Sequence, residues 1–153
     1  FVKRQMVGVF DKRWLHPFAE ALNKMGSTNA WIIHGRDGLD EVSISDITDV
    51  VQLKNGKITE FSINPEDYGF KRNTIGSIKG GDPKHNAIEL RSLLEGKEGP
   101  YKDIVLLNSA SALVGSGHEI KFETALLKSK NSLESGKALN KLKDLIEITN
   151  VES

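Results

Sequence analysis

The sequence predicts an α/β fold in which a parallel strand-helix-strand unit is followed by a β-hairpin and then by helices. Three observations support this fold class. Two short apolar runs flank an amphipathic helical pattern, an Asn-Gly pair separates two β-branched runs, and apolar residues recur at helical spacing from residue 82 onward.

The strand-helix-strand unit occupies residues 6–34. Residues 6–10 (MVGVF) and 30–33 (AWII) are apolar runs typical of buried strands. Between them, Asp11 is a candidate N-cap, a set of apolar residues follows the helical period, and Gly26 ends the helix. Two strands connected by a helix are almost always parallel, with a right-handed crossover. The apolar set consists of Leu15, Phe18, Ala19, Leu22 and Met25.

A β-hairpin is predicted next. The β-branched runs at residues 42–45 and 48–53 favour strands, and residues 57–63 form the returning strand after Asn55-Gly56. An Asn-Gly pair between two such runs is a strong hairpin signal, because both residues tolerate the left-handed conformation that the turn needs. Residues 64–67 (NPED) break the last strand and begin an irregular stretch.

The rest of the chain is predicted to be helical. Asp82 is a candidate cap, with Pro83 at the first helical position and Gly96 at the end. Residues 101–114 are apolar nearly all round, which predicts a buried central helix. Two more helices are expected at residues 120–135 and 137–148.

Composition excludes several classes of function. The 153 residues are enough for one domain with a sizeable core, and the 21 basic and 21 acidic residues cancel. No net field therefore favours nucleic acid or an anionic membrane. There is no cysteine for a disulfide or a thiolate site, and no apolar stretch approaches the ~18 residues that span a bilayer.

The first residues bear on how much of a protein this chain represents. The segment FVKRQM has no initiator Met and no signal-peptide layout, and it leads directly into an apolar strand pattern. We therefore expect the chain to be a fragment of a longer cytoplasmic protein.

The most informative segment is HGRDGLDE, residues 34–41, which follows the second parallel strand. Open α/β sheets bind their ligands at the carboxyl ends of such strands. Adjacent Asp40 and Glu41 could face one Mg²⁺ ion, which prefers oxygen ligands and is usually held by one or two carboxylates together with substrate phosphates. The spacing alone is equally consistent with an acidic turn that is exposed to solvent and binds no metal ion.

Other candidate sites are weaker. The glycines of Lys79-Gly80-Gly81-Asp82 could present amides to an anion, but a flexible loop with an ordinary Asp cap explains them better. The four histidines form no pair with zinc-site spacing, and Ser43 and Ser45 lie in no G-x-S-x-G elbow. Neither a zinc site nor a hydrolase triad is therefore predicted.

Several segments resemble a known family in both sequence and order. WIIHGRDGLDEVS (residues 31–43) is similar to the Asp-Glu signature of anthranilate phosphoribosyltransferases. QMVGVF, INPEDYGF, KGGDPKHNA and LLNSASAL (residues 5–10, 63–70, 79–87 and 106–113) resemble further segments of that family, in the same order. The resemblance covers nearly the whole chain. It implies the incomplete α/β domain of a nucleoside phosphorylase/phosphoribosyltransferase-like fold.

The resemblance also implies an activity. Such enzymes transfer the phosphoribosyl group from phosphoribosyl pyrophosphate (PRPP) to anthranilate and release pyrophosphate, in tryptophan biosynthesis. The family's Asp-Glu pair binds the Mg²⁺ that accompanies pyrophosphate, so the role of metal ligand carries over to Asp40 and Glu41 alone. No role is carried over to His34, Arg36 or Asp37.

The resemblance further implies that much of the active site lies outside this chain. Residues 1–153 correspond to the C-terminal part of the α/β domain, without the family's helical N-terminal domain and PRPP loop. We therefore expect the isolated chain to be inactive, to need its own N-terminal half, and to form a homodimer when complete. Two alternatives remain open: a nucleic-acid-binding relative of the same fold, and a pyrimidine nucleoside phosphorylase-like enzyme, against which the Asp-Glu loop argues.

Overall fold

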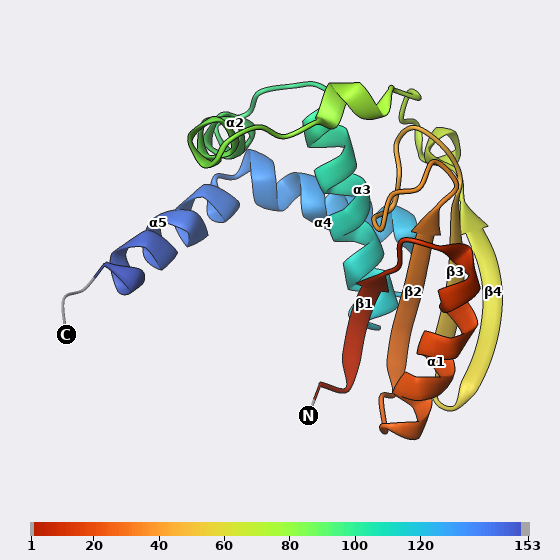
Figure 1. The fold of residues 1–153 in the computed structure, drawn as a ribbon. Coiled ribbons are helices and arrows are strands. Elements are labelled where there is room, and N and C mark those ends of the chain that lie inside the picture. The colour runs from red at the N-terminus through yellow and green to blue at the C-terminus, as the bar shows by residue number, and fades with distance from the viewer. Residues whose placement is uncertain (1, 151–153) are drawn as a thin grey trace.

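The computed structural model of the protein describes residues 2–150 and contains one four-stranded mixed sheet (Figure 1). The strand order is β1-β2-β3-β4; β1 runs parallel to β2, and the other neighbours are antiparallel. The parallel unit, the hairpin and the α/β class predicted from the sequence are confirmed. The strands are β1 (Arg4–Gly8), β2 (Asn29–Gly35), β3 (Thr48–Lys54) and β4 (Lys57–Ile63).

Helices cover both faces of the sheet. On one face lies α1 (Leu15–Lys24), preceded by the short 3-10 helix η1 (Lys12–Trp14), and on the other lies α3 (Pro100–Gly115). The side chains of β2 alternate between two cores: Trp31 and Ile33 pack with α3, and Ala30 and Ile32 pack with α1. A strand buried on both faces needs apolar residues at every position, which explains the unbroken run AWII.

The remaining helices follow the sheet in the sequence, and Phe122 and Ala125 of α4 (Phe122–Glu134) join the core on the α3 face. Helix α4 packs against α3, whereas α5 (Lys137–Thr149) has no buried residue and extends outward (Figure 1). Between β4 and α3 lie η2 (Pro65–Tyr68), η3 (Ile75–Ile78) and α2 (Pro83–Leu94). Within residues 2–150, no helix is both long and apolar enough to cross a membrane.

Three local signals in the sequence are confirmed. Asn55 and Gly56 form the hairpin turn with φ angles of 49° and 82°. Asp82 caps α2 by accepting a hydrogen bond from the His85 N–H at 2.7 Å, as expected of an Asp at this position. The predicted buried helix at residues 101–114 is α3, which packs on one face of the sheet against β1 and β2.

The predicted strand at residues 42–45 is wrong. Val42 and Ile44 are fully buried, but this segment has no strand partner. Its backbone finds partners outside the sheet. The Val42 N–H donates to Asn108 Oδ1 and the Ser43 N–H to Thr48 Oγ1, both at 2.9 Å, and the Ile44 carbonyl accepts the Asn73 N–H at 3.1 Å. The β-branched pattern therefore reflects burial of a loop.

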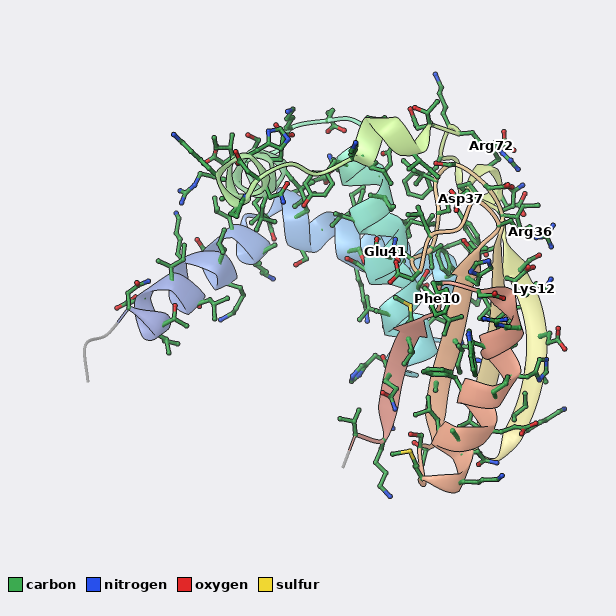
Figure 2. All side chains as sticks on the ribbon, in the orientation of Figure 1. Phe10, Lys12, Arg36, Asp37, Glu41 and Arg72 are labelled. Atoms are coloured by element: carbon green, nitrogen blue, oxygen red, sulfur yellow. The ribbon has the colours of Figure 1, made fainter. Side chains whose placement is uncertain are left out.

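The prediction of a buried strand at residues 6–10 is only partly correct. The strand ends at Gly8, and Phe10 lies beyond it with 72% of its surface exposed (Figure 2). Within the described part of the chain β1 pairs with β2 alone, so its other edge is open and its central residues are half-buried. The apolar pattern indicated a strand but could not show how fully it is covered.

Candidate metal-binding site

The acidic loop, residues 36–47, connects β2 to β3. It begins with a tight turn in which the Gly38 N–H donates to the Gly35 carbonyl and the Gly35 N–H donates to the Leu39 carbonyl, both at 2.8 Å. Gly38 has a φ of 96°, which favours glycine. The Arg36 N–H donates to the Ile47 carbonyl at 2.9 Å and closes the loop at its base.

Asp37 is engaged within the acidic loop. One carboxylate oxygen accepts a hydrogen bond from the Ser43 hydroxyl, and the other accepts from the Leu39 N–H at 3.2 Å. The Ser43 hydroxyl oxygen in turn accepts the backbone N–H groups of Ser45 and Asp46. These contacts make Asp37 part of the internal scaffold of the loop.

His34 and Arg36 also have structural partners. The ring Nδ1 of His34 lies 2.9 Å from the Val9 carbonyl oxygen, to which it donates. The guanidinium of Arg36 donates to both oxygens of Asp49, the closest contact being 2.8 Å, and Lys12 Nζ reaches the same carboxylate at 2.8 Å. Both side chains are therefore engaged by the protein itself, and neither is a candidate metal ligand.

Asp49 on β3 is the carboxylate that binds both Arg36 and Lys12. The hydrogen bond from Arg36, with a further contribution from Lys12, lowers the pKa of Asp49 against the opposing effect of burial. The same pair raises the pKa of Arg36, chiefly through the hydrogen bond to Asp49. Both cations are thereby held on the β3 side of the loop.

Asp40 and Glu41 differ from these residues. Both are exposed, and within residues 2–150 neither carboxylate has an ion-pair or hydrogen-bond partner. In Figure 2, Glu41 lies toward α3 in the view, whereas Arg36 and Lys12 lie toward β4. The chain thus presents two adjacent carboxylates, free of protein cations, at the end of the parallel strands.

This donor set fits Mg²⁺ chemically. Carboxylate oxygens are ligands that Mg²⁺ prefers, and the ion keeps several waters or takes phosphate oxygens for its remaining positions. Within the described residues, no group of three or more His, Cys, Asp or Glu side chains could hold a metal ion. The side chains of the described residues alone therefore do not complete such a site, and waters or phosphate oxygens would fill the remaining positions.

Two residues that support the loop were not identified from the sequence. Gly8 ends β1 directly beneath the loop, and a Cβ atom at this position would overlap the carbonyl group of Asp40. Asn108 of α3 contacts Val42, the residue after Glu41. The glycine in MVGVF and the Asn in the apolar run LLNSASAL are visible in the sequence, but their partners lie far along the chain.

The glycine pair Gly80-Gly81 leads into the N-terminal cap of α2. Asp82 accepts the N–H of His85, and Asn86 binds both backbone groups of Gly81, accepting from its N–H at 2.8 Å and donating to its carbonyl at 3.1 Å. The amides of Gly81 and His85 are therefore occupied by side chains. The explanation as an ordinary Asp cap is therefore confirmed.

Comparison with known proteins shows the family. Residues 1–139 match the family described as "Glycosyl transferase family, a/b domain", and the chain belongs to this family. Two similar curated proteins are the anthranilate phosphoribosyltransferases of Rhodopseudomonas palustris (strain TIE-1), 46% identical, and of Azorhizobium caulinodans, 47% identical, each over 148 residues. The alignments cover 97% of this chain and 44% and 43% of those proteins, so the chain spans less than half of their length.

Solved structures agree with this assignment. The anthranilate phosphoribosyltransferase of Thermus thermophilus matches with a TM-score of 0.80 and 33% identity, over 90% of this chain and 40% of that one. The enzyme of Saccharomyces cerevisiae in complex with PRPP and Mg matches with a TM-score of 0.84 and 27% identity, over 94% of this chain and 42% of that one. The fold is thus that of the corresponding part of these enzymes.

The contact between Gly8 and Asp40 gives a first prediction. Gly8→Ala should force the acidic loop away from β1, because the new methyl group and the Asp40 carbonyl cannot occupy the same space. Overpacking of this kind costs about 1–3 kcal/mol. Urea unfolding should show this loss, and amide hydrogen exchange should be faster at residues 36–47.

Gly76→Ala is the matched control, because a Cβ there would come no closer than 3.8 Å to Thr74 and Gly76 has no positive φ. Wild-type stability and loop exchange in Gly8→Ala would contradict the close packing described for β1 and the loop.

The ion pairs of Asp49 predict a pH dependence. The pKa of Asp49 is lower in the folded protein than its value of about 4 in an unfolded chain. Its contribution to stability is therefore complete above about pH 4 and is lost as the pH falls through the lower, folded pKa. Asp49→Asn should reduce the free energy of unfolding at pH 7 by about 1–2 kcal/mol, allowing for the exposure of its partners.

The variant should also lose stability less steeply than wild type when thermal unfolding is measured from pH 4 down to pH 2. Asp144→Asn on α5, which removes an exposed pair with Lys141, is the control and should match wild type. Equal acid sensitivity of Asp49→Asn and wild type would contradict the assignment.

Proposed function

We propose that this chain is part of an anthranilate phosphoribosyltransferase, and that Asp40 and Glu41 hold the Mg²⁺ ion that accompanies the pyrophosphate group of PRPP. The observation that carries the proposal is the pair of exposed carboxylates without protein partners within residues 2–150, on a loop whose turn is held by hydrogen bonds to Asp37 and Ser43. The similarity to enzymes of this name, one of them described in complex with PRPP and Mg, gives the substrate class.

The charges of the reaction fit this assignment. When pyrophosphate leaves the anomeric carbon of the ribose, negative charge builds on its oxygens, and a bound Mg²⁺ stabilises that charge without a proton transfer. Asp40 and Glu41 would bind and orient the ion through oxygen atoms. Arg36 and Lys12 do not neutralise these two carboxylates, because Asp49 binds both cations on the other side of the loop.

We propose further that the rest of the active site belongs to a part of the enzyme outside residues 1–153. The open edge of β1 can accept another strand, since its outer backbone groups have no partner within residues 2–150. Beside β1 lies a groove of about 790 Å³ lined mainly by apolar side chains. Those that form its walls include Met6, Leu94, Val105, Leu106, Leu113 and Leu133.

This surface is suited to the enzyme's own N-terminal half, the partner expected from the resemblance. On this proposal the isolated chain does not turn over PRPP and anthranilate, since it supplies the metal ligands without the rest of the substrate site. A role in tryptophan biosynthesis, a cytoplasmic location and a homodimeric complete enzyme remain predictions of the same proposal. The zero net charge and the carboxylate pair favour it over a nucleic-acid-binding role.

The test uses the complete enzyme that contains this chain. Asp40→Asn combined with Glu41→Gln keeps the shape of both side chains and removes their charges, so it should weaken Mg²⁺ binding while leaving the fold intact. The Mg²⁺ concentration for half-maximal activity should rise at least about tenfold, since loss of groups that merely support a metal site already costs 10–100-fold. Consumption of anthranilate fluorescence, followed against Mg²⁺ concentration, measures it.

Asp144→Asn combined with Glu147→Gln on α5 removes the same charge far along the chain from the loop and should behave as wild type. An unchanged Mg²⁺ dependence in the Asp40 and Glu41 double variant would mean that these residues are not metal ligands.

A further inference from the structure

Val42 is a buried residue outside the sheet, and its backbone N–H and carbonyl groups need hydrogen-bond partners. Its side chain is fully buried and it follows directly after the exposed Glu41, so the chain passes from solvent into the core within one residue. The segment is not part of the sheet, and its backbone groups therefore lack the partners that a strand would supply. Buried backbone groups left without partners are costly, and another part of the molecule must supply them.

Asn108 of α3 supplies both partners. Its side-chain oxygen accepts the Val42 N–H at 2.9 Å, and its NH₂ group donates to the Val42 carbonyl at 2.8 Å. The second N–H of this amide donates to the Ile104 carbonyl, one helical turn earlier, at 3.0 Å. All the donors of the side chain are used, and a flipped amide would place oxygen against oxygen, so Asn108 has one productive orientation.

This contact is specific to the loop. Among the neighbouring side chains that form hydrogen bonds in the described chain, Ser111 of α3 and Ser116 just after it donate to carbonyls of α3 itself. Lys102 of α3 pairs with Glu98 just before the helix. Asn108 instead joins two segments that lie 66 residues apart. It does so from a helix that is itself buried against the sheet and is therefore rigidly placed.

The position of Val42 bears directly on Glu41. The Val42 N–H and the Glu41 carbonyl belong to one planar peptide unit, so a hydrogen bond that fixes the N–H also fixes that plane. Before the carboxylate pair, the backbone of Asp40 rests against Gly8. The two exposed acidic residues thus lie between a steric contact on one side and a two-point hydrogen bond on the other.

We propose that Asn108 is a positioning residue for the Mg²⁺ site: its paired hydrogen bonds to Val42 hold Asp40 and Glu41 in the geometry that binds the ion. This inference rests on the proposed function of the two carboxylates. It adds a residue of the central helix, remote in sequence, on which the affinity for Mg²⁺ depends. Asn108 acts through the loop and does not itself touch the ion or the substrate.

The test compares two substitutions in the complete enzyme. Asn108→Leu keeps the approximate size and removes all three hydrogen bonds, whereas Asn108→Asp keeps the shape and the acceptor for the Val42 N–H but loses both donors. Asn140→Asp, at an exposed Asn of α5, is the control. If Asn108→Leu does not fold, Asn108→Asp and the control still decide the matter.

Amide hydrogen exchange at residues 36–47 measures the order of the loop without reference to activity. It should become faster in Asn108→Asp and faster still in Asn108→Leu. The Mg²⁺ concentration for half-maximal activity should rise about tenfold or more, as is usual for residues that support metal ligands, while kcat at saturating Mg²⁺ changes far less.

Two results would overturn the proposal. The first is wild-type exchange of the loop in both Asn108 variants. The second is faster exchange with an unchanged Mg²⁺ requirement, which would make the contact purely structural. Failure of the proposed function is recognised separately, because the Asp40 and Glu41 double variant would then keep the wild-type Mg²⁺ dependence.

Discussion

The acidic loop crosses the end of the sheet without forming a strand, and the structure around it supplies the hydrogen bonds that a neighbouring strand would otherwise provide. Thr48 and Asn108 satisfy the backbone of the buried segment, and Ser43 and Asp37 bond within the loop itself. An unpaired polar group in the core costs about 1–3 kcal/mol, so each of these hydrogen bonds stabilises the loop. A consequence is that the exposed carboxylates sit on a rigid base.

This constraint links the fold to the proposed chemistry. The parallel pairing of β1 and β2 brings Gly8 beneath the loop, and the packing of α3 on the same sheet brings Asn108 to its other side. Asp49 binds Arg36 and Lys12 and so keeps both cations off the carboxylate pair. A site for a hard cation needs such separation, because a neighbouring protein cation would compete with the metal for the same oxygens.

The sequence was sufficient where local physics decides the structure. The Asn55-Gly56 turn and the Asp82 cap depend on residues within a few positions of each other, and the hairpin strand at residues 57–63 was predicted with its observed bounds. The sequence was insufficient where contacts with residues far along the chain determine the local structure. The segment 42–45 (VSIS) has the alternating apolar pattern of a strand, and only the position of α3 shows why it forms a loop. The Asp-Glu pair was recognisable from its motif, whereas the residues that support it were not.

The most direct test of the account locates the metal ion itself. Mn²⁺ can replace Mg²⁺ as a hard cation with oxygen ligands, and its paramagnetism broadens the amide resonances of nearby residues in an NMR spectrum. With Mn²⁺ and pyrophosphate added to the isotope-labelled complete enzyme, the account predicts broadening centred on Asp40 and Glu41 that leaves α5 unaffected. Broadening centred on other carboxylates, with Asp40 and Glu41 unchanged, would contradict it.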